Sequence, residues 1–193
     1  METNFFIVAT YSYLLGSIPF GLVLTKIFLK KDIREFGSGN IGTTNVLRTG
    51  KKYLALFTLI FDLLKGYVSV FITLLYYENF TSYSALSCFI GHVFPVWLKF
   101  KGGKGVATYL GVILALSYKF FLVFGISWLV ISLLFRFASL SSMLSSLIIL
   151  FYSYFFENNS FLLVLFIFFV MILFTHRENI VRLKNSEENK IKL

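Results

Sequence analysis

The stretch FFIVATYSYLLGSIPFGLVLTKIFL, residues 5–29, contains 25 residues and a single charged side chain, that of Lys26. About 20 mostly apolar residues are enough for a helix to cross the hydrocarbon core of a bilayer. The stretch therefore predicts a membrane-spanning helix. No basic residue precedes it and no small-residue cleavage site follows it, so we expect a retained helix and not a signal peptide.

The composition extends this prediction to the whole chain. Of its 193 residues, 58% are hydrophobic and only 14% are charged, against about 25% charged in a soluble domain. We expect an all-α integral membrane protein forming one domain, residues 1–193. The net charge of +9 would suggest nucleic acid in a soluble protein, but here it indicates basic loops beside membrane lipid, with no nucleic acid partner. Cys88 is the single cysteine, which excludes an intrachain disulfide.

Six further apolar runs predict spans at 53–77, 83–98, 106–118, 120–135, 137–156 and 161–175. The segment 106–135 is ambiguous. As one helix its 30 residues would extend ~45 Å, which exceeds the ~30 Å hydrocarbon core. Two shorter helices that turn at LSYKF, residues 116–120, would fit a compact protein, so the apolar runs alone allow either six spans or seven.

The positions of the basic residues favour seven spans. Lysines and arginines gather in the segments 30–52 and 99–104 and in the tail after residue 175. The turns YENFTS (77–82) and FENNS (156–160) contain none and have one glutamate each. With seven spans, all three basic segments lie in the cytoplasm and Lys119 is the one exception. We therefore expect the N-terminus outside, the C-terminus inside, and the polar loops forming a site on the cytoplasmic face.

The first polar segment is EFGSGNIGTTNVLRTGKK, residues 35–52. Residues 37–42 match G-x-G-x-x-G, and Asp62 follows at the distance of a ribose-binding acid. That motif needs a preceding strand, however, and here a membrane helix precedes it. Glycines still allow backbone N–H groups to converge on an anion, and Arg48 can bind phosphate with two hydrogen bonds. A plain basic loop would explain the lysines but not this spacing, so we predict an anion site.

Two more polar segments follow apolar runs. In GHVFPVWLKFKGGKGVAT, residues 91–108, three glycines surround Lys104. His92 alone is more often an interior histidine than a catalyst. In THRENIVRL, residues 175–183, His176 and Asn179 would share one face if the helix continues. A juxtamembrane basic helix would explain the arginines of this segment but not these two residues.

Charged and hydroxyl side chains also occur inside predicted spans. Asp62 and Lys65 are three residues apart and are expected to form an ion pair. The segment RFASLSS, residues 136–142, is equally consistent with a site or with helix packing. Neither histidine has an aspartate five residues later, so the His-x4-Asp pattern of common glycerolipid acyltransferases is missing. There is no G-x-S-x-G motif and no metal-ligand cluster in the sequence.

Together with GSIPFG (16–21) and DLLKG (62–66), the three polar segments closely resemble the bacterial acyl-phosphate:glycerol-3-phosphate acyltransferases, the PlsY family, from residue 16 to about 184. The resemblance implies transfer of a fatty acyl group from acyl phosphate to glycerol 3-phosphate at the cytoplasmic face of the bacterial inner (plasma) membrane. It implies no metal or organic cofactor, and we expect a functional monomer. The functional positions of the family fall here on Ser38, Thr44, Arg48, Lys104, His176 and Asn179. Substrate contacts are further expected from Gly37, Gly39, Asn40, Gly42, Asn45, His92, Gly102, Gly103 and Ser142.

A transporter of a phosphorylated metabolite is the main alternative, since basic glycine-rich loops and an intramembrane charge pair would suit it. Such a protein is expected to show internal repeats or paired broken helices, and the sequence shows neither. A non-catalytic assembly factor would not need three polar segments on one face.

Overall fold

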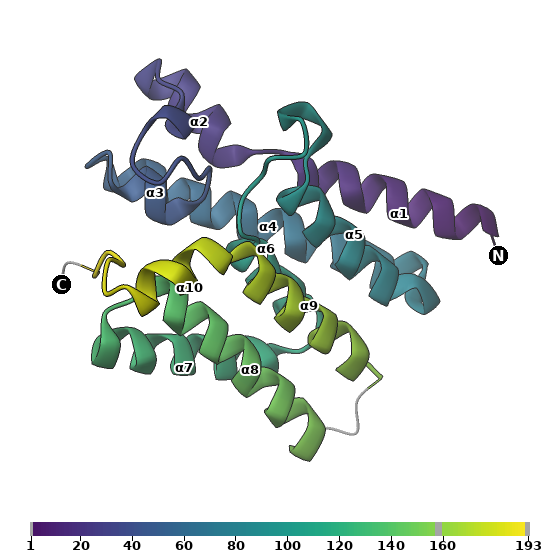
Figure 1. Ribbon diagram of the computed structural model, residues 1–193. Coiled ribbons are helices and arrows are strands. Elements are labelled where there is room, and N and C mark those ends of the chain that lie inside the picture. Colours follow the sequence, from purple (N-terminus) through teal and green to yellow (C-terminus); the bar gives the residue numbers. More distant parts are fainter. Residues whose placement is uncertain (1, 157–159, 192–193) are drawn as a thin grey trace. The chain divides into compact units, whose positions relative to one another are not determined.

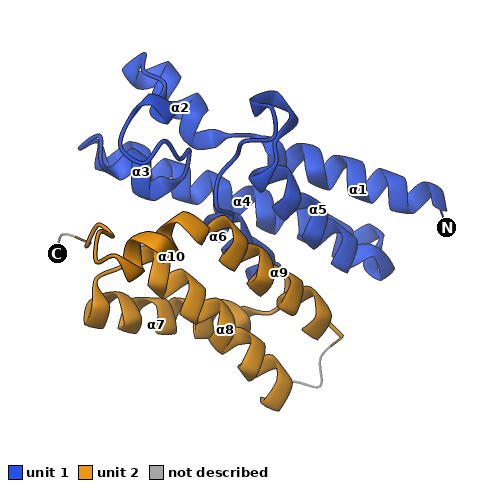
Figure 2. Ribbon diagram, in the orientation of Figure 1, with its two compact units in different colours: residues 1–115 blue, residues 116–193 orange. Residues whose placement is uncertain are grey.

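The computed structural model describes residues 2–156 and 160–191. In these ranges the chain forms helices and turns and no strand (Figure 1), as the sequence predicts. The chain divides into two compact units, residues 1–115 and residues 116–193 (Figure 2). The expectation of a single domain stays a prediction. Glu157 of the predicted FENNS turn lies outside the described residues.

The described part of the first unit, residues 2–115, contains six α-helices and three short 3-10 helices. In chain order they are α1 (Glu2–Ser17), α2 (Phe20–Leu29), η1 (Ile33–Glu35), α3 (Thr43–Leu47), α4 (Lys52–Tyr76), η2 (Glu78–Phe80), α5 (Thr81–Val93), η3 (Val96–Leu98) and α6 (Val106–Leu116). Helix α4 packs against α1, α2, α3 and α5, and α1 also packs against α5. Helix α4 is therefore the central element of this unit.

The first predicted span is broken in the middle. Helix α1 ends at Ser17, and Pro19 precedes α2, because proline cannot donate the backbone hydrogen bond that a continuous helix needs. The carbonyl oxygen of Ile18 accepts a 2.8 Å hydrogen bond from Nζ of Lys65 in α4. A polar backbone group at a break inside a membrane needs such a partner.

Glycines bring the helices of the first unit into close contact. A Cβ atom on Gly16 of α1 would overlap the backbone of Cys88 in α5, and one on Gly91 of α5 would overlap the backbone of α1. Gly66 of α4 and Gly111 of α6 approach each other's helices in the same way. Small residues at helix contacts are common in membrane proteins, where close packing replaces the hydrophobic driving force.

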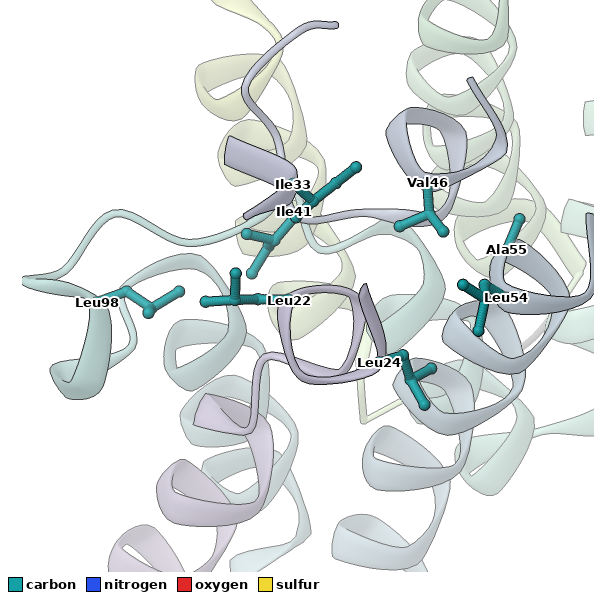
Figure 3. Packing of buried hydrophobic residues seen from close by; sticks show 8 residues of the cluster. All are labelled: Leu22, Leu24, Ile33, Ile41, Val46, Leu54, Ala55 and Leu98. Atoms are coloured by element: carbon teal, nitrogen blue, oxygen red, sulfur yellow. The ribbon is translucent and has the colours of Figure 1, made fainter. Parts of the chain in front are cut away.

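A buried apolar cluster supports the polar segment that follows α2. Ile33 of η1, just before this segment, and Ile41 and Val46 within it pack with Leu22, Leu24, Leu54, Ala55 and Leu98 (Figure 3). Ile33, Ile41 and Val46 are each at most 2% exposed. The apolar residues scattered through a glycine-rich sequence thus hold it against α2 and α4.

The second unit consists of α7 (Tyr118–Phe135), α8 (Ala138–Phe156), α9 (Leu162–Thr175) and α10 (Arg177–Lys184). Helix α8 packs against α7 and α9. Ser117 precedes α7, and its side chain accepts a hydrogen bond from the backbone N–H of Lys119. Helix α6 ends at Leu116 and α7 begins at Tyr118, so the predicted division of this segment into two helices at LSYKF is confirmed.

The candidate spans are fewer than the sequence suggests. By length and composition, Glu2–Leu29 counted through its break, Lys52–Tyr76, Tyr118–Phe135 and Ala138–Phe156 can cross a membrane, and α9 with α10 would make a fifth if that bent pair is one span. In the described part of the chain, α5 has 13 residues and α6 has 11. The count of seven and the orientation of the termini stay predictions.

Candidate functional site

The glycine-rich segment between α2 and α4 is organised by the side chain of Asn45. The two hydrogens of its Nδ2 are shared among three carbonyl oxygens, those of Ile33 (3.1 Å), Phe36 (2.9 Å) and Asn40 (2.8 Å). Its Oδ1 accepts a 2.9 Å hydrogen bond from the N–H of Ser38. Asn45 is 2% exposed, so one buried amide holds the loop around itself. The sequence predicts that Asn45 contacts substrate. In the structure its amide instead forms hydrogen bonds with backbone groups of the same loop.

Two glycines give this loop its shape. Gly37 has φ 59° and Gly39 has φ 70°, in the left-handed region that is unfavourable for other residues. A Cβ atom on Gly37 would also overlap Oδ1 of Asn45 and lie 3.2 Å from Cδ of Arg48. The backbone conformation therefore requires glycine at residues 37 and 39, both of which the sequence predicts to be part of the site. The absence of a side chain at Gly37 also allows the Arg48 side chain to pack close to the loop.

The polar side chains predicted to act on substrate lie at the outside of this loop. Ser38, Thr44 and Arg48 are all exposed. The structure shows no ion pair to Arg48 among the residues it describes. Gly42 donates its backbone N–H to Oδ1 of Asn40, at 2.9 Å, so Asn40 also contributes to the fold of the loop.

The nearby carboxylate of Asp32 is held by a different arginine. Nε and Nη2 of Arg34 donate to it at 2.9 and 2.6 Å, and Lys26 lies 3.7 Å away. The hydrogen bond from the Arg34 side chain, together with the charges of Arg34 and Lys26, lowers the pKa of Asp32 well below its ordinary value. Asp32 is therefore a charged anchor at the start of η1, where its side chain also accepts from the N–H of Arg34.

The second polar segment folds back onto the end of α5. The N–H groups of Gly102 and Gly103 donate to the carbonyl oxygens of Val93 and His92, at 3.0 and 3.1 Å. A Cβ atom on Gly102 would overlap the carbonyl oxygen of His92, and one on Gly103 would overlap Nε2 of its imidazole. Both predicted glycines thus pack directly on His92. Lys104 follows at once and is half-buried.

His92 lies in the interior of the first unit, beside the ion pair of α4. It is 4% exposed, and its Nδ1 lies 3.7 Å from Oδ1 of Asp62, which is beyond hydrogen-bonding distance. Asp62 and Lys65 are 2.8 Å apart and each side chain is 2% exposed, which confirms the predicted pair. The interior position agrees with the ordinary interpretation of a lone histidine, and a role for His92 in substrate binding stays a prediction.

The third polar segment lies in the second unit, where one helix ends and a second begins at a bend. Helices α9 and α10 meet at His176 at an angle of 59°. His176 Nδ1 lies 2.8 Å from the carbonyl oxygen of Ile172; a carbonyl can only accept, so Nδ1 bears the hydrogen. His176 and Asn179 are 3% and 5% exposed. The condition for a shared helix face is not met, because the backbone bends at the histidine itself.

Asn179 belongs to a polar cluster that the sequence did not reveal. Its Nδ2 donates a 2.7 Å hydrogen bond to the carboxylate of Glu188 in the C-terminal tail. Ser139 and Arg182 donate to the same carboxylate. The tail sequence does not show which of the adjacent glutamates, Glu187 or Glu188, makes this contact. The contact depends on how the tail folds back onto α8 and α10.

Ser142 has a structural environment of its own. Its hydroxyl group donates to the carbonyl oxygen of Ala138 at 2.8 Å and accepts from Nε1 of Trp128 at 3.1 Å. These bonds connect α8 to α7, as expected of a helix-packing serine. Its predicted contact with substrate stays a prediction.

Comparisons with known proteins agree along nearly the whole chain. The family model described as glycerol-3-phosphate acyltransferase matches residues 6–186. A glycerol-3-phosphate acyltransferase of Pelagibacter ubique is 53% identical over 190 residues, covering 98% of this chain and 99% of that protein. One from Brucella anthropi is 48% identical over 181 residues, covering 94% of this chain and 90% of that protein.

Two crystal structures are similar to the fold. They are of PlsY, an integral membrane glycerol 3-phosphate acyltransferase, in its glycerol 3-phosphate form and its lysophosphatidic acid form. Their TM-scores to this chain are 0.93 and 0.90 at 34% identity, and both alignments cover 98% of this chain and 96% of the other.

Proposed function

The chain belongs to the glycerol-3-phosphate acyltransferase family, and on this premise we propose that it transfers a fatty acyl group from an acyl phosphate to glycerol 3-phosphate. The products are 1-acyl-glycerol 3-phosphate and phosphate. The observation that carries the proposal is the family match over residues 6–186. The glycine-rich loop built around Asn45, with Arg48 at its outer side, supplies a physical basis for binding phosphate.

The chemistry needs little from the enzyme beyond binding and orientation. The glycerol hydroxyl oxygen attacks the acyl carbonyl carbon and forms the ester bond, while the bond from that carbon to the phosphate oxygen breaks. The hydroxyl proton passes to an oxygen of the donor's own phosphate. An acyl phosphate is a mixed anhydride with a good leaving group, so no covalent enzyme intermediate is required. This is consistent with a sequence that lacks a His-x4-Asp pair.

Six residues are proposed to act on the substrates. Arg48 and Lys104 neutralise phosphate charge, since both substrates carry phosphate. Ser38, Thr44, His176 and Asn179 orient the reactants, and one or more of Ser38, His176 and Asn179 donate a hydrogen bond to the tetrahedral oxyanion. The remaining predicted contacts shape or line the substrate sites; they are Gly37, Gly39, Asn40, Gly42, Asn45, His92, Gly102, Gly103 and Ser142.

We further propose that the protein acts as a monomer in the inner membrane of a bacterium. It has seven spans, an external N-terminus and an active site that faces the cytoplasm, where glycerol 3-phosphate is available. The basic segments 30–52, 99–104 and the tail support this orientation. A phosphatase that is active only outside the cytoplasm, fused after Leu193, should be inactive. An active fusion would require an even number of spans with this N-terminus.

The decisive experiment uses detergent-purified protein, glycerol 3-phosphate and palmitoyl phosphate. We expect 1-palmitoyl-glycerol 3-phosphate and phosphate in equal amounts, and little or no product when palmitoyl-coenzyme A replaces palmitoyl phosphate. Comparable rates with the thioester would mean that a side chain acts as the base, and would overturn the proposed proton transfer. Uptake of glycerol 3-phosphate into proteoliposomes with no acylated product would favour a transporter.

A further inference from the structure

The turn that carries Lys104 packs on two rings of α5. Lys104 lies between Gly103 and Gly105, both of which are buried. A Cβ atom on Gly105 would overlap the ring of Phe89, and one on Gly103 would overlap Nε2 of His92. Because neither glycine has a side chain, the backbone on each side of Lys104 lies directly against an aromatic ring of α5. The position of Lys104 therefore depends on how these two rings are placed.

The contact with Gly103 determines which nitrogen of His92 carries a hydrogen. The place of a Cβ atom on Gly103 overlaps Nε2 and lies 3.0 and 3.1 Å from Cε1 and Cδ2, the two ring carbons bonded to Nε2. It is therefore on the outer side of Nε2, where a hydrogen on that nitrogen would point. In glycine a hydrogen of Cα points to this place. Two hydrogens would collide there, whereas an unprotonated Nε2 can accept the Cα–H as a weak hydrogen bond. The neutral imidazole then carries its hydrogen on Nδ1.

On its other side the imidazole faces the ion pair of α4. Nδ1 lies 3.7 Å from Oδ1 of Asp62, and it forms no hydrogen bond within the part of the chain that the structure describes. The His92 and Asp62 side chains are 3% and 2% exposed, so little water screens the attraction between the carboxylate and the positive end of the N–H bond. Lys65 lies 2.8 Å from the same oxygen and balances its charge. A carboxylate beside one ring nitrogen favours the tautomer with the hydrogen on that nitrogen.

We propose that Asp62 is a positioning residue for the acyl transfer: it holds the hydrogen of His92 on Nδ1, so that the unprotonated Nε2 allows the turn of Gly103 and Lys104 to pack against the ring. With the hydrogen on Nε2, the ring would have to rotate or the turn would have to move, and Lys104 would move with it. The inference rests on the proposed function, in which Lys104 binds substrate phosphate.

The same arrangement gives His92 no part in proton transfer. Its single unprotonated nitrogen is covered by the Cα–H of Gly103, and its other nitrogen already carries a hydrogen. A general base needs a free nitrogen within hydrogen-bonding distance of the proton that it removes. This agrees with a reaction in which the phosphate of the donor takes the hydroxyl proton.

The tautomer can be measured directly, because the chain contains only two histidines. The experiment is nitrogen NMR of the full-length protein in detergent, with isotope-labelled histidine. The imidazole signals of His92 are those that disappear in His92→Gln. At neutral pH we expect a hydrogen on Nδ1 of His92 and none on Nε2. A hydrogen on Nε2, or on both nitrogens, would overturn the proposal.

Two double variants separate the acceptor at residue 62 from the buried charges. Asp62→Asn/Lys65→Met and Asp62→Leu/Lys65→Met both remove the ion pair without leaving one charge unpaired. Asparagine can still present an oxygen to Nδ1, and leucine cannot. With glycerol 3-phosphate and palmitoyl phosphate, we expect kcat/KM to be about 10-fold lower in the leucine variant, the effect of slightly misplacing a binding group. The hydrogen of His92 should stay on Nδ1 only in the asparagine variant. Equal values of kcat/KM would overturn the proposal.

The route through His92 is tested by adding His92→Ala to both double variants. If Asp62 acts through the imidazole, the two triple variants should have the same kcat/KM. A difference that persists without the ring would overturn the proposal, because Asp62 would then act on the turn in another way. A wild-type protein that makes no product would reject the proposed function, and with it a role of Asp62 in the reaction. The NMR measurement does not depend on turnover and would still decide the tautomer.

Discussion

The ammonium group of Lys65 donates a 2.8 Å hydrogen bond to the carbonyl oxygen of Ile18, and so ties α4 to the break between α1 and α2. The same Nζ lies 2.8 Å from Oδ1 of Asp62. One buried cation therefore binds both a carboxylate and a backbone carbonyl at the break in the helix.

Lys65→Met should destabilise the protein by about 3–5 kcal/mol, because it leaves the Asp62 charge buried without its partner. The double variant Asp62→Asn/Lys65→Met removes both charges and should lose less. The free energy of unfolding in mixed detergent micelles is the measurement. Lys26→Met is the control: Lys26 is 54% exposed and 3.7 Å from Asp32, and such surface pairs contribute at most about 1 kcal/mol. A double variant as unstable as Lys65→Met would show that the bond to Ile18 is the dominant contribution.

Arg48→Ala should lower kcat/KM at least about 100-fold, the usual effect of removing one donor that stabilises charge in an active site. Lys51→Ala, a few residues along the same basic loop, should change kcat/KM less than about threefold because it removes only a solvent-exposed charge. Arg48→Lys keeps the charge without the two-pronged geometry and should fall between them. Similar losses for Arg48→Ala and Lys51→Ala would mean that the loop acts through its total charge.

Asn45→Ala should disorder the glycine-rich loop, since it removes the hydrogen bonds to Ile33, Phe36, Asn40 and Ser38. Faster proteolytic cleavage within residues 30–50 and a loss of turnover are expected together. Asn45→Asp has the same shape but cannot donate to carbonyl oxygens, so it should be as damaging.

Asn4→Ala is the control for Asn45→Ala, because Asn4 is exposed and lies near the N-terminus. It should change neither the rate of proteolytic cleavage within residues 30–50 nor the rate of turnover. An Asn45→Asp variant with normal turnover and an intact loop would contradict the organising role of this amide.

The sequence predicts most of the fold because the length of an apolar run decides whether it forms a long helix. Lys52–Tyr76 and Ala138–Phe156 agree with the predicted spans to within a residue, and the turn at Ser117 follows from length alone. The breaks were harder to predict. Pro19 interrupts the first run, yet membrane helices often tolerate proline. The bend at His176 has neither proline nor glycine beside it.

The candidate site, like the fold, is only partly predictable from the sequence. Glycine and arginine in one loop indicate anion binding from composition, but no sequence pattern shows that Asn45 bonds to four positions of its own loop. The contact between Asn179 and Glu188 depends on the path of the tail, which local sequence does not determine. Hydrogen-bond partners brought together by folding are therefore the part of the site that only a structure supplies.

The attachment of the tail should weaken in acid. Burial favours the neutral form of Glu188, but hydrogen bonds from Arg182, Asn179 and Ser139 outweigh it and hold the pKa of Glu188 below its ordinary value of 4.5. A lowered pKa contributes stability above the unfolded-state value, and that contribution is lost as the pH falls through the folded-state value.

The unfolding temperature of wild type should therefore exceed that of Glu188→Gln by a constant amount between pH 7 and about 5.5, and the difference should shrink below about pH 4.5. Glu187→Gln should show no such dependence. A difference that already disappears between pH 7 and about 5.5 would mean that burial, and not the three donors, controls this carboxyl group.

The packing of Gly103 on His92 gives a test that does not alter any charge. A Cβ atom at residue 103 would overlap Nε2 of the imidazole, and the N–H of Gly103 is bonded to the His92 carbonyl oxygen at 3.1 Å. Gly103→Ala must therefore displace either the histidine or the loop that continues into Lys104. We expect kcat/KM to fall at least about 10-fold, because Lys104 moves with its neighbour.

Gly125→Ala is the matched control, since a Cβ atom there meets nothing within 4 Å, and alanine favours the helix. It should leave both turnover and the unfolding temperature unchanged or slightly raised. Adding His92→Ala to Gly103→Ala removes the overlapping ring and should restore the unfolding temperature. If Gly103→Ala alone behaves like Gly125→Ala, the imidazole can turn away without cost, and the contact does not position Lys104.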